Sequence, residues 1–377
     1  MHLYLHVPFC KKACHYCDFH FVTNTSRKTE MVAAMVKELE LQKDFLKQKS
    51  LKTIYFGGGT PSLLEFADFE LIFSKIKSIY DLSQIEEITL EANPDDISLE
   101  NIKTWKHFGV NRISLGIQTF DESALNFMNR AHTRADAITS LEMLIADGLP
   151  NISVDLIYSL IDQNGELGHE VLKQDLEIIA KYNLPHVSAY NLTIENKTVL
   201  GAWKKQGKLK EVEDEYAEEQ FNILTKTLKE LGYEQYEVSN FAKNGAYAVH
   251  NTSYWKNKAY LGIGPSAHSY DLEKRFANVA NNAKYIKALD AGHLATQEEI
   301  LSITDKVNDY ILCGLRTIWG INISILKEIA GEVPKEFYEA LNEFIMNGWV
   351  TMRTQNIVIT EKGRIFSDRI TSSLFFE

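Results

Sequence analysis

Six short runs rich in β-branched and other apolar residues recur along the first half of the chain, with longer amphipathic stretches between them. Strands that alternate with helices in this way predict a parallel sheet with crossover helices. In the helical stretch 27–47 the apolar residues form one stripe: Val32, Met35, Val36 and Leu39. The expected strands are HLYLHV (2–7), LKTIYF (51–56), EEITLEAN (86–93), NRISLGI (111–117), NISVDLIY (151–158) and HVSAYNL (186–192). Six such units predict an α/β fold with an incomplete (β/α)6 TIM-like barrel, which binds ligands at the carboxyl ends of its strands.

The second half of the chain departs from this pattern. A full barrel would need two more β/α units, but the chain continues into a long helix with one apolar face, formed by Ala217, Phe221, Leu224, Leu228 and Leu231. Beyond Asp305, short helices and one hairpin-like segment resemble a small C-terminal winged-helix-like α+β domain. We therefore expect a partial barrel over 1–210, a segment packed on it over 211–300, and the C-terminal domain over 301–377.

Charge and hydropathy limit the classes of partner. The 377 residues carry a net charge of −11, and residues 301–377 have eight Lys and Arg against ten acidic residues, which disfavours nucleic acid as a partner. No run of about 18 uncharged apolar residues and no signal-peptide pattern occurs, so no membrane span is expected. The cytoplasm is the expected location. The sequence leaves open whether the protein contacts the inner face of a membrane peripherally or forms a homodimer.

Three of the four cysteines lie close together, as Cys10, Cys14 and Cys17 in the run HVPFCKKACHYCDFH. Three thiolates on one tight loop suit a [4Fe–4S] cluster whose fourth iron stays open to chelation by a small molecule such as S-adenosylmethionine (SAM). Structural zinc sites instead use four ligands and pair their cysteines as C-x2-C. A disulfide would leave an unpaired set. The fourth cysteine, Cys313, falls in the apolar stretch DYILCGL and is expected to be an inert buried thiol.

Longer motifs extend the cysteine pattern. The run YLHVPFCKKACHYCDF, followed by YFGGGTPSLL, resembles the coproporphyrinogen-III-oxidase-like branch of the radical SAM superfamily, and the resemblance continues through most of the chain. It implies a barrel of the radical SAM type, a cluster bound by the three cysteines, and SAM as cofactor. The positions that the resemblance assigns to SAM are Tyr4, Gly58, Gly59, Thr60, Glu91, Gln118, Arg130, Asp155 and Ala189.

Each of these positions also has an ordinary structural interpretation. The glycine run after strand 51–56 permits close approach of a ligand to the backbone, or forms a tight turn. Glu91, Gln118 and Asp155 lie at or near predicted strand ends, where they could contact SAM or join a satisfied polar network. Arg130 could bind the methionine carboxylate of SAM as a bidentate fork, or brace an acidic neighbour.

Two features separate an oxidase from a haem chaperone. The oxidases carry a further cysteine two residues after the third, where this chain has Phe19, and a long N-terminal extension, whereas this sequence begins three residues before Tyr4. The segments YEVSNFA and HNTSYW resemble the haem chaperone branch of the family. That resemblance implies haem binding, with His250 as ligand of the haem iron and Tyr254 and Trp255 against the porphyrin. The alternative is a polar loop histidine with two core aromatics.

The interpretation favoured by these patterns is a haem chaperone on a radical SAM scaffold, with a [4Fe–4S] cluster, SAM and haem as cofactors. Its expected partners are haem and recipient haem proteins such as respiratory enzymes. No catalytic residue is assigned, and the sequence does not decide whether SAM is cleaved. The alternative activity is oxygen-independent coproporphyrinogen III oxidation, and a plain iron–sulfur electron carrier is the third class. The run LGIGPSAHSY is expected to be a glycine-rich loop, with His268 as a secondary haem candidate.

Overall fold

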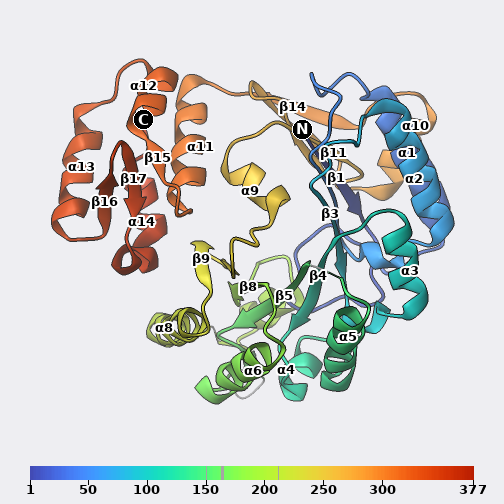
Figure 1. Cartoon of the computed structure of the whole chain (residues 1–377), viewed down its shortest axis with the longest axis horizontal. Helices are drawn as coiled ribbons and strands as arrows, with labels where there is room; N and C mark the ends of the chain where they lie inside the picture. Colours follow the sequence, from blue (N-terminus) through green and yellow to red (C-terminus); the bar gives the residue numbers. More distant parts are fainter. Residues whose placement is uncertain (150, 163–164, 211) are drawn as a thin grey trace.

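The computed structural model describes residues 1–149, 151–162, 165–210 and 212–377. Its main feature is a curved sheet of twelve strands in the order β14-β13-β12-β11-β1-β2-β3-β4-β5-β8-β10-β9 (Figure 1). Seven neighbouring strands of this sheet run parallel: β11 (Tyr260–Ile263), β1 (His2–Val7), β2 (Thr53–Gly58), β3 (Glu87–Ala92), β4 (Arg112–Gln118), β5 (Asn151–Tyr158) and β8 (His186–Asn191). The six strands expected from sequence are thus confirmed, and β11 adds a seventh.

Antiparallel strands extend both edges of the parallel sheet. On one edge β12 (His268–Tyr270), β13 (Lys274–Asn278) and β14 (Thr296–Ile300) follow β11, and on the other β10 (Asn240–Ala242) and β9 (Glu234–Glu237) follow β8. Within the described part of the chain, the end strands β14 and β9 do not pair with each other. The barrel is therefore open, as expected. The segment 212–300 supplies strands to both of its edges.

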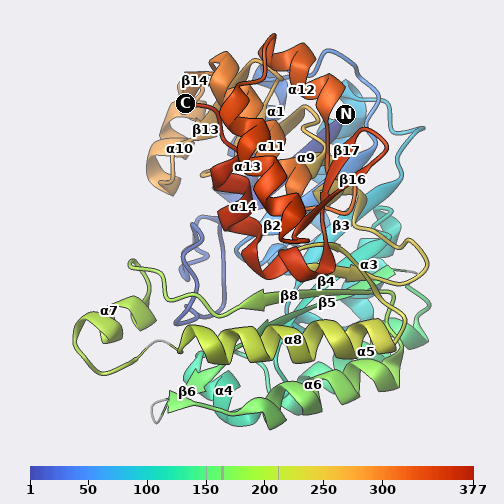
Figure 2. The same cartoon turned by 90° about the vertical axis from the view of Figure 1, so that its left-hand side faces the viewer.

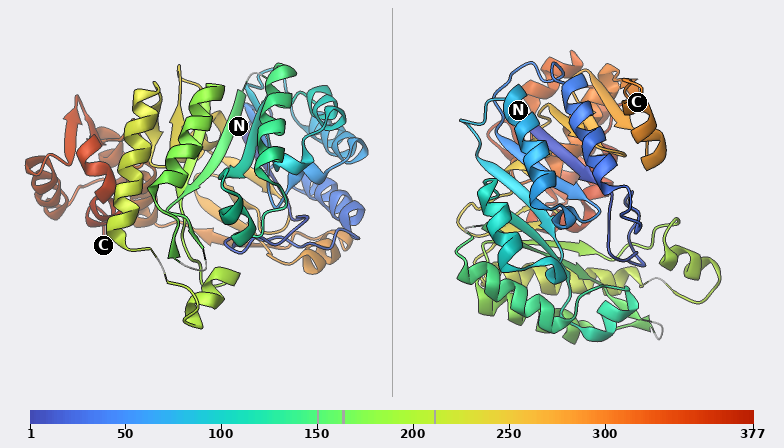
Figure 3. Two further views of the ribbon diagram at one scale, coloured as in Figure 1. Left: turned by 90° about the horizontal axis from the view of Figure 1, so that it is seen from below. Right: turned by 90° about the vertical axis from the view of Figure 1, so that its right-hand side faces the viewer.

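Helices cover the convex face of the sheet (Figures 1 and 3). They are α1 (Lys28–Leu41), α2 (Phe66–Ile79), α3 (Leu99–His107), α4 (Glu122–Phe127), α5 (Arg134–Ala146), α6 (His169–Tyr182), α8 (Asp214–Glu230) and α10 (Asn282–Asp290). The main core lies between these helices and the sheet, and includes the α1 stripe residues Val32, Met35 and Leu39. Burying one apolar stripe of each helix against the sheet is the main stabilisation of such an arrangement. The helix predicted from Ala217 to Leu231 is α8, with Leu231 as its C-cap.

The glycine-rich run 261–270 is not the loop expected from its composition. It forms β11 and β12, joined by a tight connection. Position 262, within β11, requires glycine, because a Cβ there would lie 2.0 Å from the carbonyl oxygen of His268. Gly264 adopts φ +107° where the chain passes His6. The glycines thus allow two backbones to approach closely inside a strand pair, a use of glycine that composition does not distinguish from a loop.

The C-terminal elements have a core of their own. Helices α11 (Ile303–Leu315), α12 (Ile323–Ala330), α13 (Lys335–Met346) and α14 (Ser367–Ser373) pack against a three-stranded antiparallel sheet of β15 (Ile321–Asn322), β17 (Asn356–Ile359) and β16 (Val350–Arg353). The boundary expected at 300/301 falls between β14 and α11, whereas the one expected at 210/211 includes residue 211, outside the described residues. None of the helices among the described residues combines the length and hydropathy that a membrane crossing needs.

Two short strands and two further helices lie among the described residues. The short strands β6 (Ile161–Asp162) and β7 (Gly165–Glu166) pair antiparallel after β5. Helix α7 (Val199–Lys205) projects at one side of the molecule (Figure 2). Helix α9 (Val249–Trp255), which contains the motif HNTSYW, lies between the large sheet and the C-terminal elements (Figure 1).

Candidate functional site

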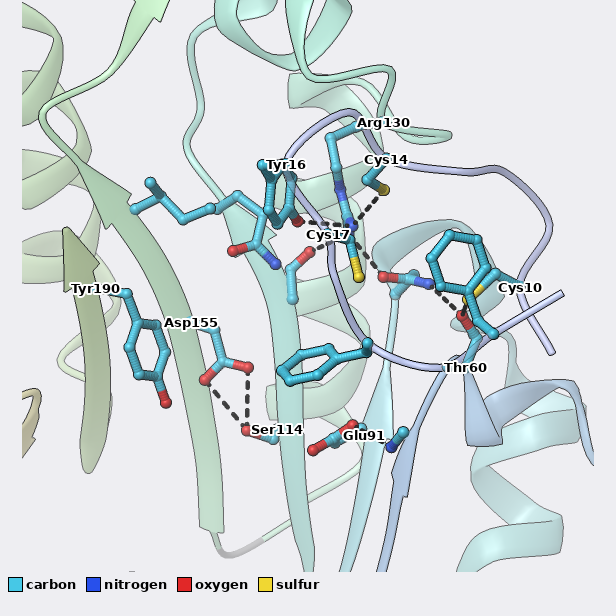
Figure 4. A pocket seen from close by; sticks show the side chains of 18 of the residues that line it. Cys10, Cys14, Tyr16, Cys17, Thr60, Glu91, Ser114, Arg130, Asp155 and Tyr190 are labelled. Atoms are coloured by element: carbon cyan, nitrogen blue, oxygen red, sulfur yellow. Dashed lines mark hydrogen bonds between the residues drawn. The ribbon is translucent and has the colours of Figure 1, made fainter. Parts of the chain in front are cut away.

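A cavity of about 450 Å³ lies at the carboxyl ends of the parallel strands. This volume falls in the range of about 300 to 1,000 Å³ that is usual for small-molecule sites. Its wall combines the loop after β1 with the ends of β2, β3, β4, β5 and β8 (Figure 4). Ten residues expected at the cluster and at SAM line it: Cys10, Cys14, Cys17, Gly58, Gly59, Thr60, Glu91, Gln118, Arg130 and Asp155. The topology therefore brings residues from six separate segments to one place.

The three cysteines lie on the loop that follows β1. The backbone N–H of Cys10 donates to Val22 O at 3.0 Å, which closes this loop, and Cys17 N–H donates to Cys14 O at 3.3 Å. Between them, His15 N–H donates to Met128 O at 3.0 Å, and its ring packs edge-on against Trp203 of α7 at 4.9 Å. All four cysteines of the chain are free thiols. Contacts from distant segments thus hold the loop with its thiols toward the cavity.

The thiols have donors that suit thiolate ligands. Thr60 Oγ1 donates to Cys10 Sγ and Arg130 Nη1 donates to Cys14 Sγ, each at 3.4 Å (Figure 4). Burial raises the pKa of Cys10 to about 11 and that of Cys17 to about 12, so without a metal both remain protonated at neutral pH. Among the described residues, no group of three or more His, Cys, Asp and Glu side chains could hold a metal ion. That finding concerns a single metal ion and does not apply to an iron–sulfur cluster, in which each thiolate binds a different iron.

The glycine run is shaped by the cysteine loop. A Cβ on Gly59 would lie 2.7 Å from the carbonyl oxygen of Phe9, and one on Gly58 would lie 2.7 Å from the His6 ring. Gly58 also has φ +107°, which disfavours any other residue. Both glycines line the cavity as well, so the tight turn and the close approach to a ligand site are compatible here.

Two carboxylates face the cavity from β3 and β5, the strands on either side of β4. Glu91 accepts the Tyr55 hydroxyl at 2.7 Å and Gly58 N–H at 3.1 Å, and burial raises its pKa to about 7. Asp155 accepts the Ser114 hydroxyl at 3.2 Å, and burial raises its pKa to about 6. Carboxylates with such raised pKa values in a cavity are candidates for ligand contact.

Arg130 is bound by protein groups on two sides. Its Nη2 donates to Asn93 Oδ1 and to Gly116 O, each at 2.6 Å, while its Nη1 contacts Cys14 Sγ and the Tyr16 hydroxyl at 3.3 Å. In this geometry the guanidinium braces the cysteine loop against β3 and β4. Its Nε is buried and has no hydrogen-bond partner among the described residues.

Two expected SAM positions lie outside the cavity wall. The Tyr4 hydroxyl pairs with His6 Nδ1 at 3.2 Å, and Ala189 is buried with its N–H donating to Ser239 O at 2.8 Å. The residues on either side of Ala189, Ser188 and Tyr190, do line the cavity. Period-two alternation along the strand was the signal that could have identified them. The lining residues that the sequence analysis did not single out also include Asn93, Ser114 and Asn251.

His250 lies beneath the cavity rather than in its wall. Its side chain is fully buried, Nδ1 pairs with Thr53 Oγ1 at 2.6 Å, and Nε2 pairs with the Tyr254 hydroxyl at 2.7 Å. Thr53 Oγ1 in turn pairs with His2 Nδ1 at 2.9 Å. Both ring nitrogens are therefore occupied by protein groups, and burial lowers the pKa of His250 well below its usual value, so the ring is neutral. Only the next residue, Asn251, reaches the cavity.

The aromatic residues of the same helix point in different directions. The Tyr254 ring contacts Tyr260 at 4.6 Å, edge-on, whereas the Trp255 ring lies 5.5 Å from the guanidinium of Arg316 at the end of α11. Tyr254 and Trp255 thus do not form one continuous aromatic wall beside His250. His268, the secondary candidate, is exposed on β12.

Comparisons with known proteins agree on one superfamily. The family model described as the radical SAM superfamily matches residues 4–195. The heme chaperone HemW of Lactococcus lactis is 35% identical over 361 residues, which is 96% of this chain and 93% of the relative. The heme chaperone HemW of Bacillus subtilis is 31% identical over 99% of each protein.

Among solved structures, coproporphyrinogen III oxidase (HemN) from Escherichia coli, a radical SAM enzyme, superposes with a TM-score of 0.85. It is 20% identical, and the match covers 99% of this chain and 89% of that one. At this identity the similarity concerns the fold alone.

Proposed function

Because the chain belongs to the radical SAM superfamily and, within it, to the family of the heme chaperone HemW, we propose that it binds haem and delivers it to haem proteins. The observation that carries the proposal is the match over nearly the whole chain to proteins named as haem chaperones. Radical SAM proteins use SAM and a [4Fe–4S] cluster. In this protein Cys10, Cys14 and Cys17 would hold the cluster, which would leave one iron for SAM.

The cavity residues support separate roles in SAM binding, as hydrogen-bond acceptors and as a support for the cysteine loop. Glu91 and Asp155 present carboxylate oxygens that would accept hydrogen bonds from the ribose hydroxyls of SAM or lie beside its sulfonium. Arg130 would keep Cys14 and the loop around it in place, because its two Nη atoms join that loop to Asn93 and Gly116. Tyr4 and Ala189 would support the SAM site from positions outside the cavity wall.

Haem is proposed to bind through His250 after a local rearrangement. With its proton on Nδ1, the ring donates to Thr53 and presents the Nε2 lone pair to the Tyr254 hydroxyl. This tautomer is the one that a metal ligand needs, and a hydrogen bond from the second nitrogen orients such a ligand. Removal of the Tyr254 hydroxyl from Nε2 would free the ligand atom, while Tyr254 and Trp255 would remain near the porphyrin edge.

The test is a haem titration of the wild type and three variants, with the Soret band followed to saturation. We expect saturable binding by the wild type and weaker binding or changed ligation in His250→Ala. Tyr254→Phe should bind about fivefold more tightly, because haem no longer competes with a hydrogen bond of about 1 kcal/mol. The exposed His268→Ala is the matched control and should equal the wild type.

Each arm of this experiment has its own meaning. Absence of saturable binding by the wild type would contradict haem delivery itself. Wild-type behaviour of His250→Ala would contradict only the assignment of the ligand. The oxidase alternative is not favoured, and it predicts product from coproporphyrinogen III with SAM and a reductant under anaerobic conditions, where we expect none.

Partners and location follow from the same proposal. The recipients would be haem proteins such as respiratory enzymes, reached from the cytoplasm or from the inner face of a membrane. A homodimer is part of the proposal, and sedimentation of the holoprotein over a range of concentrations would test it.

A further inference from the structure

A buried arginine lies below the floor of the cavity. Arg112 is 1% exposed, and its Nε and Nη1 atoms are buried without a hydrogen-bond partner among the described residues. A buried charge without partners is costly, so it is retained only where something compensates it. The groups around Arg112 include carboxylates whose negative charge compensates its positive charge.

Arg112 shares one face of β4 with cavity residues. Side chains alternate along a strand, so Arg112, Ser114 and Gly116 point to the same side. Ser114 and Gly116 line the cavity, which places Arg112 one layer deeper, about 7 Å below Ser114 along the strand. The Ser114 hydroxyl donates to Asp155. Arg112 is thus directly beneath the residue that holds the Asp155 carboxylate.

Two carboxylates lie on opposite sides of this cation. Glu87, on β3, accepts the backbone N–H groups of Val249 and His250 at 2.8 and 2.9 Å, so its oxygens already hold the start of α9. Asp155, on β5, is the carboxylate on the cavity side. Both act electrostatically on Arg112, with Glu87 as the strongest attraction. The arginine is therefore a shared counter-charge rather than half of an ion pair.

The pKa of Asp155 depends on groups from every element packed around it. Arg112 is the largest of the effects that oppose its burial, ahead of its hydrogen bonds to Ser188 and Ser114. The other charged or titratable groups that face it are Glu91 from β3, Tyr55 from β2, Tyr190 from β8 and Arg130 from the segment after α4. The neighbouring imidazoles of His186 and His250 have pKa values lowered by burial, so they add no positive charge.

We propose that Arg112 is a positioning residue of the SAM site, an internal cation that keeps the Asp155 carboxylate ionised and ready to accept hydrogen bonds from the ligand. It acts through Asp155 and does not itself touch SAM. The proposal rests on SAM binding in the cavity, and it is independent of haem binding or delivery. A chain that failed every haem test could still satisfy it.

The experiment measures the dissociation constant of SAM against pH from 5.5 to 9 on the anaerobically reconstituted protein. In the wild type, affinity should fall in two steps as pH falls, first through about 7, the pKa of Glu91, and then through about 6, the pKa of Asp155. In Arg112→Gln the same fall should occur at higher pH, so that SAM binds about tenfold more weakly at pH 7 and recovers near pH 9. Arg112→Lys keeps the charge and should retain the wild-type midpoint.

Two controls separate charge from structure. Asp155→Asn should bind weakly and lose the step near pH 6 while the Glu91 step remains, and Arg369→Gln, at an exposed position on α14, should match the wild type. A profile for Arg112→Gln that is parallel to the wild type, or an unchanged midpoint, would overturn the proposal, since a merely structural role lowers affinity equally at every pH.

A second measurement needs neither SAM nor the cluster. Infrared difference spectra between the wild type and Asp155→Asn isolate the protonated carboxyl band of Asp155. We expect this band to vanish as pH rises through about 6 in the wild type. Persistence of the band above pH 8 in the wild type would show that Arg112 does not keep the group ionised, even if Arg112→Gln failed to fold.

Discussion

At the scale of single residues, the candidate site is held together by side chains that serve two purposes. Thr60 donates to Cys10 and accepts from Asn93 Nδ2 at 3.2 Å. Arg130 likewise joins Cys14 to Asn93. The residues expected to contact ligands are therefore also those that fix the cysteine loop. Substitutions at Thr60 or Arg130 will mix the two effects, whereas the cysteines can be tested more cleanly.

Cys14→Ala should abolish the visible absorption of the cluster after anaerobic reconstitution, because each thiolate holds one iron. The backbone of the loop is fixed by contacts other than this thiol, so the protein should stay folded. Absorbance and bound iron per chain are the measurements. Cys313→Ala is the matched control, since this thiol lies on α11, away from the cavity, and should leave the cluster intact. Retention of a full cluster by Cys14→Ala would refute the ligand assignment.

At the scale of elements, helix α6 is tied to the turn after β4 by one buried carboxylate. Asp175 accepts the Thr119 hydroxyl at 2.7 Å and Phe120 N–H at 2.8 Å. Burial raises the pKa of Asp175 to about 7 despite these hydrogen bonds. The folded protein therefore takes up a proton here at a higher pH than the unfolded chain. This carboxyl contributes stability that is full below its unfolded pKa and is lost as pH rises to about 7.

The Asp175→Asn variant cannot titrate at this position and should lack that loss. Between pH 5 and pH 7.5, the stability of the wild type relative to the variant should fall by about 2 kcal/mol. Urea unfolding of both proteins at the two pH values measures this change. A difference that stays constant with pH would mean that Asp175 is ionised throughout the range.

At the scale of the whole molecule, the C-terminal elements meet the barrel at β9, the strand at one edge of the large sheet. Ile318 N–H donates to Tyr236 O at 3.0 Å and Val238 N–H donates to Arg316 O at 3.1 Å, which extends the sheet edge. Arg316 Nε also contacts the buried carboxylate of Glu237 at 3.4 Å. Because the same guanidinium faces Trp255, Arg316 links α9 to both parts of the molecule.

Arg316→Ala should lower the free energy of unfolding by about 1 to 3 kcal/mol, because it leaves the buried Glu237 without its cationic partner. Urea unfolding measures the loss, and limited proteolysis should show earlier cleavage between the barrel and the C-terminal elements. Arg369→Ala removes a comparable guanidinium, 5.7 Å from the Trp349 ring within the C-terminal part, and should cost much less. Equal losses in the two variants would argue against a special role for the junction.

Sequence patterns predicted the structure best where the pattern depends on residues close together in the chain. Six of the seven parallel strands and the α1 stripe are visible as periodicity, and the structure has them. The run 261–270 was expected to be a loop, but its glycines serve close strand pairing: the turn between β11 and β12 brings the His268 carbonyl against Gly262. In the site, strand ends identified Glu91 and Asp155, but Ser188 and Tyr190 line the cavity where Ala189 was expected.

The sequence by itself determined six of the seven parallel strands, the three-cysteine loop and the family, because spacing and alternation are properties of neighbouring residues. Only the tertiary structure decided what each polar group is bonded to. His250 pairs with Thr53, 197 residues away, and Arg112 lies between carboxylates from two other strands without bonding to either. Such partners are set by how the sheet curves and how α9 packs beneath the cavity, and no local pattern contains that information.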